Sequence, residues 1–248
     1  MEISLLKLVL YTVGIFTVAL LGALPPIFKE WSDRQLHSFI AFGAGVFLGA
    51  IFLHLLPDAL EIVSDVPASS MVLFGFLAIL LIEKIIFDSH RIKCGSDCDH
   101  RHEVIGIIAL IGLSVHSLTA GFGLGVGMIE PELGLIIFIA IIAHKATAAF
   151  SLATIFKLAG YSRKRNLSLI LLFSLMTPLG ALISLPFIES LRDVSLAIPT
   201  GITAGTFLYV VTIDLLPEAF HDNENKIARF VWLLLGVLLM YFIKLGGA

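Results

Sequence analysis

Two histidines stand near the middle of long apolar stretches of this 248-residue chain, His116 in one stretch and His144 in the next. Ionisable side chains are expensive to place inside such stretches and commonly serve a function there. A neutral imidazole is a good ligand for Zn²⁺ and for its neighbours in the periodic table. The matched pair therefore predicts a metal site with Ser117 beside it, although a hydrogen bond to another helix would explain either histidine alone.

Lys145 directly follows the second of these histidines, and an ammonium group in that place needs an explanation. It can pair with a carboxylate, lose its proton, or take the place of a second cation. The sequence leaves these three interpretations open.

Further ligand-type residues occur twice, at positions that are 160 residues apart. In each set the second and third ligands follow the first by four and seven residues, a spacing that places side chains on one face of an α-helix. A phenylalanine precedes each set by seven residues. The two sets are Phe47, His54, Asp58 and Glu61, and Phe207, Asp214, Glu218 and His221. Because carboxylates and imidazoles both bind transition metals, we expect a vestibule of metal ligands at each mouth of a path through the protein.

A polar connection over residues 88–103 carries five further residues with metal-binding side chains: His90, Cys94, Cys98, His100 and His102. Thiolate and imidazole ligands suit zinc, although this spacing matches no fixed zinc-finger pattern. We expect the loop to handle metal after its passage. A solvated loop with incidental histidines is the alternative interpretation.

The elements that must position these residues are membrane-spanning helices. Hydrophobic residues make up 58% of the chain and charged residues 14%, whereas a soluble domain carries about 25% charged residues. The mean hydropathy is +1.01. Eight apolar segments are each long enough to cross a bilayer, namely 5–27, 37–60, 71–87, 104–128, 133–156, 167–188, 196–219 and 228–245. We therefore predict an all-α integral membrane protein with a single transmembrane domain and no cleavable signal peptide.

Basic residues divide the connections between these segments into two groups. Alternate connections hold Lys29, Arg34, Lys84, Arg91, Lys93, Arg101, Lys157, Arg163, Lys164, Arg165, Lys226 and Arg229, whereas the others hold only Arg192. Short loops rich in lysine and arginine stay in the cytoplasm. The pattern predicts a cytoplasmic 88–103 loop and two non-cytoplasmic termini, in the plasma membrane or in an organellar membrane.

The segments 44–59 and 204–219 form an internal repeat, in which eight of the sixteen positions are identical without a gap. They lie on the second and seventh predicted helices, and a separation of five helices reverses the direction through the membrane. The repeat therefore predicts an inverted topology with a 3+2+3 arrangement, as in many secondary transporters. Pro57 and Pro217 are expected to kink or end their helices and to free carbonyl groups that can face a cavity.

Several of these stretches resemble the ZIP (Zrt/Irt-like) family of metal transporters. His116-Ser117, with the glycine-rich run after it, is similar to the fourth helix of that family, and residues 144–151 are similar to its fifth helix in the branch with lysine after histidine. Residues 177–180 and 204–209 resemble the sixth and seventh helices. The resemblance implies eight helices, a transport site between the fourth and fifth, and import of zinc or iron into the cytoplasm.

The chain departs from this family at three positions. Ala120 stands where the fourth helix usually carries glutamate, Ala148 where some branches carry one in the fifth, and Thr177 where other branches have an acid before the sixth-helix proline. A second metal ion beside the first is therefore not expected, and Lys145 is predicted to stand in its place.

The sequence thus predicts a transporter of zinc, or of iron, manganese or cadmium, and not an enzyme. No permanently bound cofactor and no nucleic-acid partner are expected, and a homodimer is left open. One alternative is a metal sensor of the same fold that does not transport. Another is a membrane electron carrier with His116 and His144 as haem ligands. An intramembrane protease is disfavoured because the chain has no H-E-x-x-H motif and Ser117 adjoins its histidine.

Overall fold

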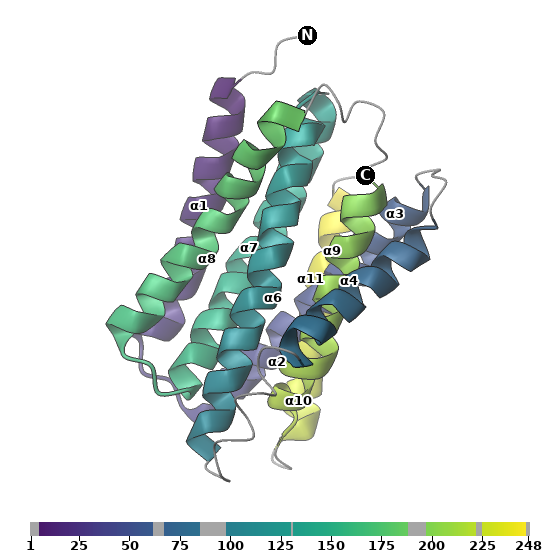
Figure 1. Cartoon of the computed structure of the whole chain (residues 1–248). Helices are drawn as coiled ribbons and strands as arrows, with labels where there is room; N and C mark the ends of the chain where they lie inside the picture. The colour runs from purple at the N-terminus through teal and green to yellow at the C-terminus, as the bar shows by residue number, and fades with distance from the viewer. Residues whose placement is uncertain are drawn as a thin grey trace.

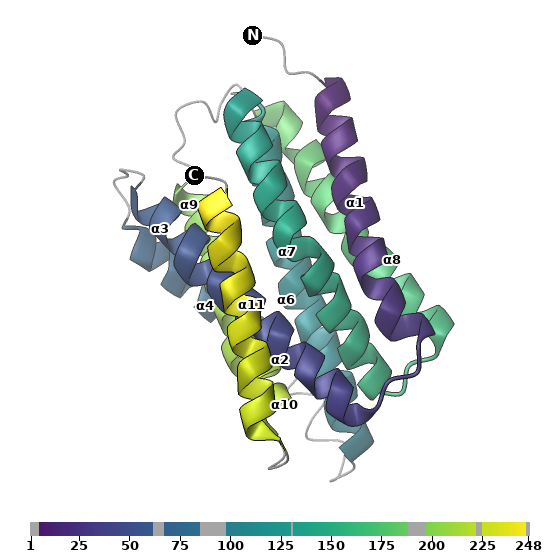
Figure 2. The same cartoon turned by 180° about the vertical axis from the view of Figure 1, so that it is seen from behind.

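The computed structural model describes residues 5–61, 67–84, 98–129, 131–187, 197–221 and 225–246. Regular structure within these ranges is helical throughout and forms one bundle (Figures 1 and 2). The helices are α1 (Leu5–Phe28), α2 (Asp33–Gly49), η1 (Ala50–Leu55), α3 (Leu56–Glu61), α4 (Ala68–Ile82), α6 (Cys98–Gly127), α7 (Pro131–Leu158), α8 (Arg163–Ser184), η3 (Leu185–Phe187), α9 (Ala197–Tyr209), η4 (Val210–Leu215), α10 (Leu216–Ala219) and α11 (Lys226–Gly246). The predicted all-α class is confirmed.

Seven helical segments among the described residues are long and apolar enough to cross a membrane. The described part of α4 is equally apolar but shorter. Large apolar side chains stay exposed on the outside of the bundle, for example Leu10 on α1 and Phe242 on α11. Such a surface suits lipid rather than water. The chain is therefore a multi-pass membrane protein.

The boundary of α6 differs from the sequence-based expectation. The helix begins at Cys98, whereas the apolar pattern placed its start at residue 104. Periodicity of apolar residues marks the part of a helix that lies in the membrane, and a polar first turn lies outside that signal.

Two helices of the bundle contain a π-helical segment. α2 continues through η1 into α3, and α9 continues through η4 into α10, with the two π-segments 160 positions apart like the sequence repeat. Each π-turn holds more residues than an α-turn, so side chains beyond it are rotated relative to α-helical spacing. From the sequence, we expected positions seven apart to share one face of the helix. Across η1 or η4 they do not.

The freed carbonyl next to Pro57 has a partner. Proline has no N–H group, so the carbonyl of Leu53 loses its usual donor four residues later. The ammonium group of Lys244 on α11 donates to that carbonyl oxygen. This hydrogen bond therefore connects the end of α11 to the end of η1.

Close packing sets the helix pairs. α2 lies along α11, α4 along α9, α1 along α7 and α6 along α8, and α6 also contacts α7 at the centre. Gly45 on α2 touches the backbone of Leu233 on α11, and Gly205 on α9 touches that of Val72 on α4. A larger residue at either glycine would hold the helices apart.

The two helices that carry the sequence repeat run in opposite directions. Figure 1 shows α2 and α9 running in opposite directions, with the start of α1 and the end of α11 toward the same end of the bundle. These observations fit an inverted repeat, which stays an inference from the sequence match.

Candidate metal sites

The two histidines near the middle of their helices lie against each other. His116 on α6 and His144 on α7 are both buried, and their ring centroids are 5.4 Å apart with a 63° angle between the ring planes. Contact between α6 and α7 brings them together, although 28 positions separate them in the chain. We call His116 and His144 the central pair.

Each ring of the central pair has one nitrogen without a hydrogen-bond partner. These atoms are Nδ1 of His116 and Nε2 of His144. Buried polar atoms are nearly always hydrogen-bonded, so an orphaned one needs an explanation. The ring of His144 is also hydrogen-bonded to the backbone of Ala140, which fixes its orientation. An orphaned, oriented imidazole nitrogen is suited to binding a metal ion.

One phenylalanine from the repeat, Phe207, covers the central pair, and the other, Phe47, packs against it. The ring of Phe207 lies 3.5 Å from that of His116 and 5.7 Å from that of His144, measured between centroids. Phe47 packs edge-on against Phe207 at 4.7 Å. Both phenylalanines are fully buried. The sequence marked these residues as neighbours of the vestibules, whereas the structure places Phe207 directly on the histidines.

Lys145 sits beside the central pair and is almost completely buried. Its Nζ donates hydrogen bonds to Oγ of Ser117 at 2.7 Å and to Oγ1 of Thr177 at 3.0 Å. The ammonium also lies 4.0 Å from the ring centroid of Phe173, a favourable cation–π distance. These described contacts involve hydroxyl groups and a ring instead of a carboxylate. Because Ser117 accepts from Lys145, it is poorly placed to act as a metal ligand as well.

The two alanines that replace family carboxylates take part in apolar packing. Ala148 is 1% exposed within the main core cluster. Ala120 is partly buried and packs against a second cluster formed with Leu124, Ile141 and Ala181. Neither alanine can supply a ligand atom, so the central pair has no carboxylate from these positions.

The first of the two expected vestibule sets is described only in part. His54 lies within η1, and its Nε2 is 3.1 Å from the carbonyl oxygen of Met240 on α11. Asp58 and Glu61 lie in α3, but their side chains are outside the described part of the structure. The first vestibule therefore stays a prediction.

Two members of the second set, Glu218 and His221, lie close together, and a residue from outside the set lies beside them. Among the described side chains, His37, Glu218 and His221 form a group whose ligand atoms all lie within 4.8 Å of one another. Asp214 is buried in η4 and does not belong to this group. The π-turn between the repeat phenylalanine and α10 changes which residues share a face. We call His37, Glu218 and His221 the mouth cluster.

His37 is the member of this group that sequence reasoning missed. It begins the second predicted span, and no ligand-type residue follows it at helical spacing, so only its type and Asp33 four residues before it could have indicated a site. Its neighbours come from α10 and the turn after it, about 180 positions later in the chain. Only the packing of the start of α2 against the end of the seventh span reveals the cluster.

The cysteine- and histidine-containing loop falls mostly outside the described residues. His90 and Cys94 lie there entirely. Cys98, His100 and His102 form the first turns of α6, but their side chains are not described. Metal binding by these five residues stays a prediction.

The fold and the central pair define a class, namely a multi-pass helical membrane protein with metal-type ligands at its centre. A family model described as ZIP zinc transporter matches residues 4–92 and 87–244. The chain is 24% identical to zinc transporter ZIP1 of Takifugu rubripes over 288 residues, which covers 94% of this chain and 95% of that protein. It is 35% identical to zinc transporter ZIP9 of Micropogonias undulatus over 165 residues, covering 62% of this chain and 52% of that protein. The chain belongs to the ZIP zinc transporter family.

Proposed function

We propose that this protein carries Zn²⁺, or a similar divalent transition-metal ion, across a membrane toward the cytoplasm, with His116 and His144 as ligands near the middle of the path. Membership of a zinc transporter family supports zinc as the substrate. The observation that carries the residue assignment is the pair of orphaned, buried imidazole nitrogens on the contacting helices α6 and α7. Nitrogen ligands of this kind suit Zn²⁺.

A single ion at the centre fits the surroundings better than two. Lys145 places a positive charge beside the histidines and is held there by Ser117 and Thr177. An ammonium at this position repels a second cation. Because Ala120 and Ala148 add no negative charge, an ion on neutral imidazoles is held weakly and leaves readily. Transport requires binding that is strong enough for entry and weak enough for release.

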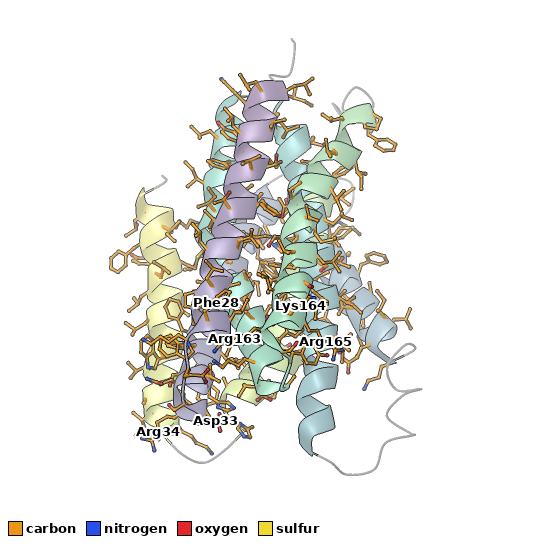
Figure 3. The ribbon with its side chains drawn as sticks, turned by 90° about the vertical axis from the view of Figure 1, so that its left-hand side faces the viewer. Phe28, Asp33, Arg34, Arg163, Lys164 and Arg165 are labelled. Atoms are coloured by element: carbon orange, nitrogen blue, oxygen red, sulfur yellow. The ribbon has the colours of Figure 1, made fainter. Side chains whose placement is uncertain are left out.

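The distribution of charge supports the proposed orientation of the protein in the membrane. Figure 3 shows Arg34, Arg163, Lys164 and Arg165 gathered at the lower end of the bundle. α1 begins and α11 ends toward the other end (Figure 1). Basic residues mark the cytoplasmic side, so we propose that both termini face away from the cytoplasm.

A membrane-impermeant thiol reagent tests this orientation. Cys94 and Cys98 are the two cysteines of the chain. They should escape the reagent in intact cells and react once the membrane is permeabilised. Reaction in intact cells would overturn the proposed orientation.

The haem alternative fits the geometry poorly. Axial histidines bind iron from opposite faces of a flat macrocycle, so the ring must fit between them. Here the two imidazoles nearly touch, and Phe207 covers both. A metal sensor that does not transport shares every ligand with the proposed transporter, so only a flux measurement separates them.

Uptake of Zn²⁺ into vesicles that contain the purified protein tests transport directly. The wild type should take up zinc, and His116→Ala and His144→Ala should each lose most of the flux. Ser174→Ala is the control, because Ser174 is equally buried and donates to the carbonyl of Ile170 in its own helix. Zinc binding by the wild type without any flux would favour the sensor.

A further inference from the structure

We propose that His37, Glu218 and His221 bind a second divalent transition-metal ion at one mouth of the bundle, separately from the central pair. The donors are two imidazoles and one carboxylate, a set that suits Zn²⁺ with a water molecule in the fourth position. They come from the start of α2, from α10 and from the turn that follows α10. This proposal does not depend on transport through the central pair.

The three donors converge on one point. Nε2 of His37 lies 3.3 Å from Oε1 of Glu218, and the ring centroids of His37 and His221 are 4.6 Å apart. One ligand atom from each residue lies within 4.8 Å of the other two. Ligand atoms around one zinc ion, each about 2.0–2.2 Å from the metal, lie roughly 3–4 Å from one another. Small shifts of the exposed His221 side chain would complete such a site.

Backbone contacts set the tautomer of both histidines. Nδ1 of His37 lies 2.7 Å from the carbonyl oxygen of Asp33, and Nδ1 of His221 lies 3.2 Å from that of Glu218. A carbonyl oxygen only accepts, so the nitrogen that faces it carries the proton. Nε2 of each neutral ring then carries the lone pair. Metal-binding histidines are typically held in this way by a backbone carbonyl or a carboxylate.

The unsatisfied nitrogen of His37 points to a cation. The residue is 5% exposed, and its Nε2 makes no hydrogen bond of ordinary geometry although it faces the carboxylate of Glu218. A lone pair and a carboxylate oxygen repel each other unless positive charge lies between them. A metal ion supplies that charge, and so does a proton on His37. The choice between metal ion and proton is what an experiment must decide.

Among the described residues, Arg229 is a cation near the site. Arg229 is buried at the start of α11 and donates from Nη1 to the carbonyl oxygen of Ala219 at 3.1 Å. The positive charge of Arg229 repels a metal ion, and the negative charge of Glu218 offsets this repulsion. Exposure of His221 leaves a route for an ion to exchange with water. The structure thus favours an exchangeable ion.

The place of the mouth cluster gives it a role relative to the central pair. α10 and the start of α2 lie at the end of the bundle that also carries the basic residues (Figures 2 and 3). In the proposed orientation that end faces the cytoplasm. A metal ion bound there would link α2 to α10 and would occupy the side on which a transported ion leaves.

Counting bound Zn²⁺ by equilibrium dialysis of the purified full-length protein in detergent tests the proposal. His37→Ala, Glu218→Gln and His221→Ala should each remove one zinc equivalent or weaken its binding at least tenfold. The same loss should occur when each change is made in a His116→Ala/His144→Ala background, which shows that the two sites are separate. Ser38→Ala is the matched control, because Ser38 is buried one position from His37 and bonds to the carbonyl of Arg34.

Thermal unfolding separates a metal site from a protonated pair. Zn²⁺ should raise the melting temperature of the wild type, because an ion that binds only the folded state stabilises it, and His221→Ala should reduce that rise. Since His221 is exposed, this variant should fold. Unchanged zinc binding in all three variants, with a lower melting temperature for His37→Ala and Glu218→Gln but not for His221→Ala, would overturn the proposal in favour of a protonated His37 paired with Glu218.

Discussion

The central pair and the mouth cluster each contain two histidines, yet they differ in charge and in access to water. The central pair is buried with Lys145 as its charged neighbour, whereas the mouth cluster has Glu218 among its members and the exposed His221 at its edge. A cation on neutral ligands beside an ammonium is held weakly, and a carboxylate ligand strengthens binding. We therefore expect the neighbouring charge, and not residue type alone, to set how strongly each pair of imidazoles binds a metal ion.

The largest expected effect is a difference in zinc flux between variants of the central pair and variants of the mouth cluster. His116→Ala/His144→Ala should reduce zinc uptake by reconstituted vesicles at least tenfold, because both ligands in the middle of the path are lost. His37→Ala/His221→Ala should slow uptake by a smaller factor, since ions can still cross and leave. Equal losses in the two double variants would mean that both sites are obligatory steps of one path.

A carboxylate added to the central region should make it resemble the mouth cluster. Ala120 lies one helical turn after His116, so a glutamate there would extend toward the same ion. We expect Ala120→Glu to tighten zinc binding roughly tenfold, or about 1.4 kcal/mol, and to lower the zinc concentration at half-maximal uptake. Protons should compete more strongly in this variant between pH 5.5 and 7.5, because they then compete for a carboxylate as well as for imidazoles.

Zinc titration of Ala120→Glu checks this expectation, with Ala120→Gln as the uncharged control of similar size. If Ala120→Glu binds zinc no more tightly than Ala120→Gln, then the ion does not sit beside His116. The metal ion would then bind closer to the vestibules than to the central pair.

Removal of the amine of Lys145, which we propose is protonated, should act in the same direction with a smaller effect. Lys145→Gln keeps a side chain that can donate to Ser117 and Thr177 but carries no charge. We expect zinc binding to tighten several-fold, because the repulsion between the ammonium and the ion is gone. Lys145→Arg keeps the charge and serves as the control. Weaker binding in Lys145→Gln would show that Lys145 supports the histidines and does not compete with the ion.

The smallest effect is expected for the five metal-binding residues of the segment 88–103. Replacement of His90, Cys94, Cys98, His100 and His102 by serine should change the uptake rate about twofold and leave transport in place, because all five residues lie before the predicted span that begins at residue 104. Vesicle uptake under saturating zinc measures the rate. A variant that inserts well but carries no zinc would place the loop on the main path.

Composition and periodicity were enough to predict the helical membrane fold. Inside a bilayer, the backbone N–H and C=O groups of a chain can all be hydrogen-bonded only in helices or closed barrels. Long apolar segments such as 5–27 and 228–245 therefore indicated their structure without tertiary information. The histidines His116 and His144 were identifiable for a related reason. A polar residue in the middle of such a stretch stands out against its surroundings.

Relations between distant segments were decided by the tertiary structure. The sequence left the partner of Lys145 open, and helix packing supplied Ser117 and Thr177, two hydroxyl groups on different helices. The π-turns in η1 and η4 changed which residues share a helix face compared with α-helical spacing, and no residue pattern predicted these turns. His37 joined Glu218 and His221 only because α2 begins where the seventh span ends. Local sequence specifies which helices form, but the neighbours of a side chain depend on how those helices pack, and this depends on close contacts such as those at Gly45 and Gly205.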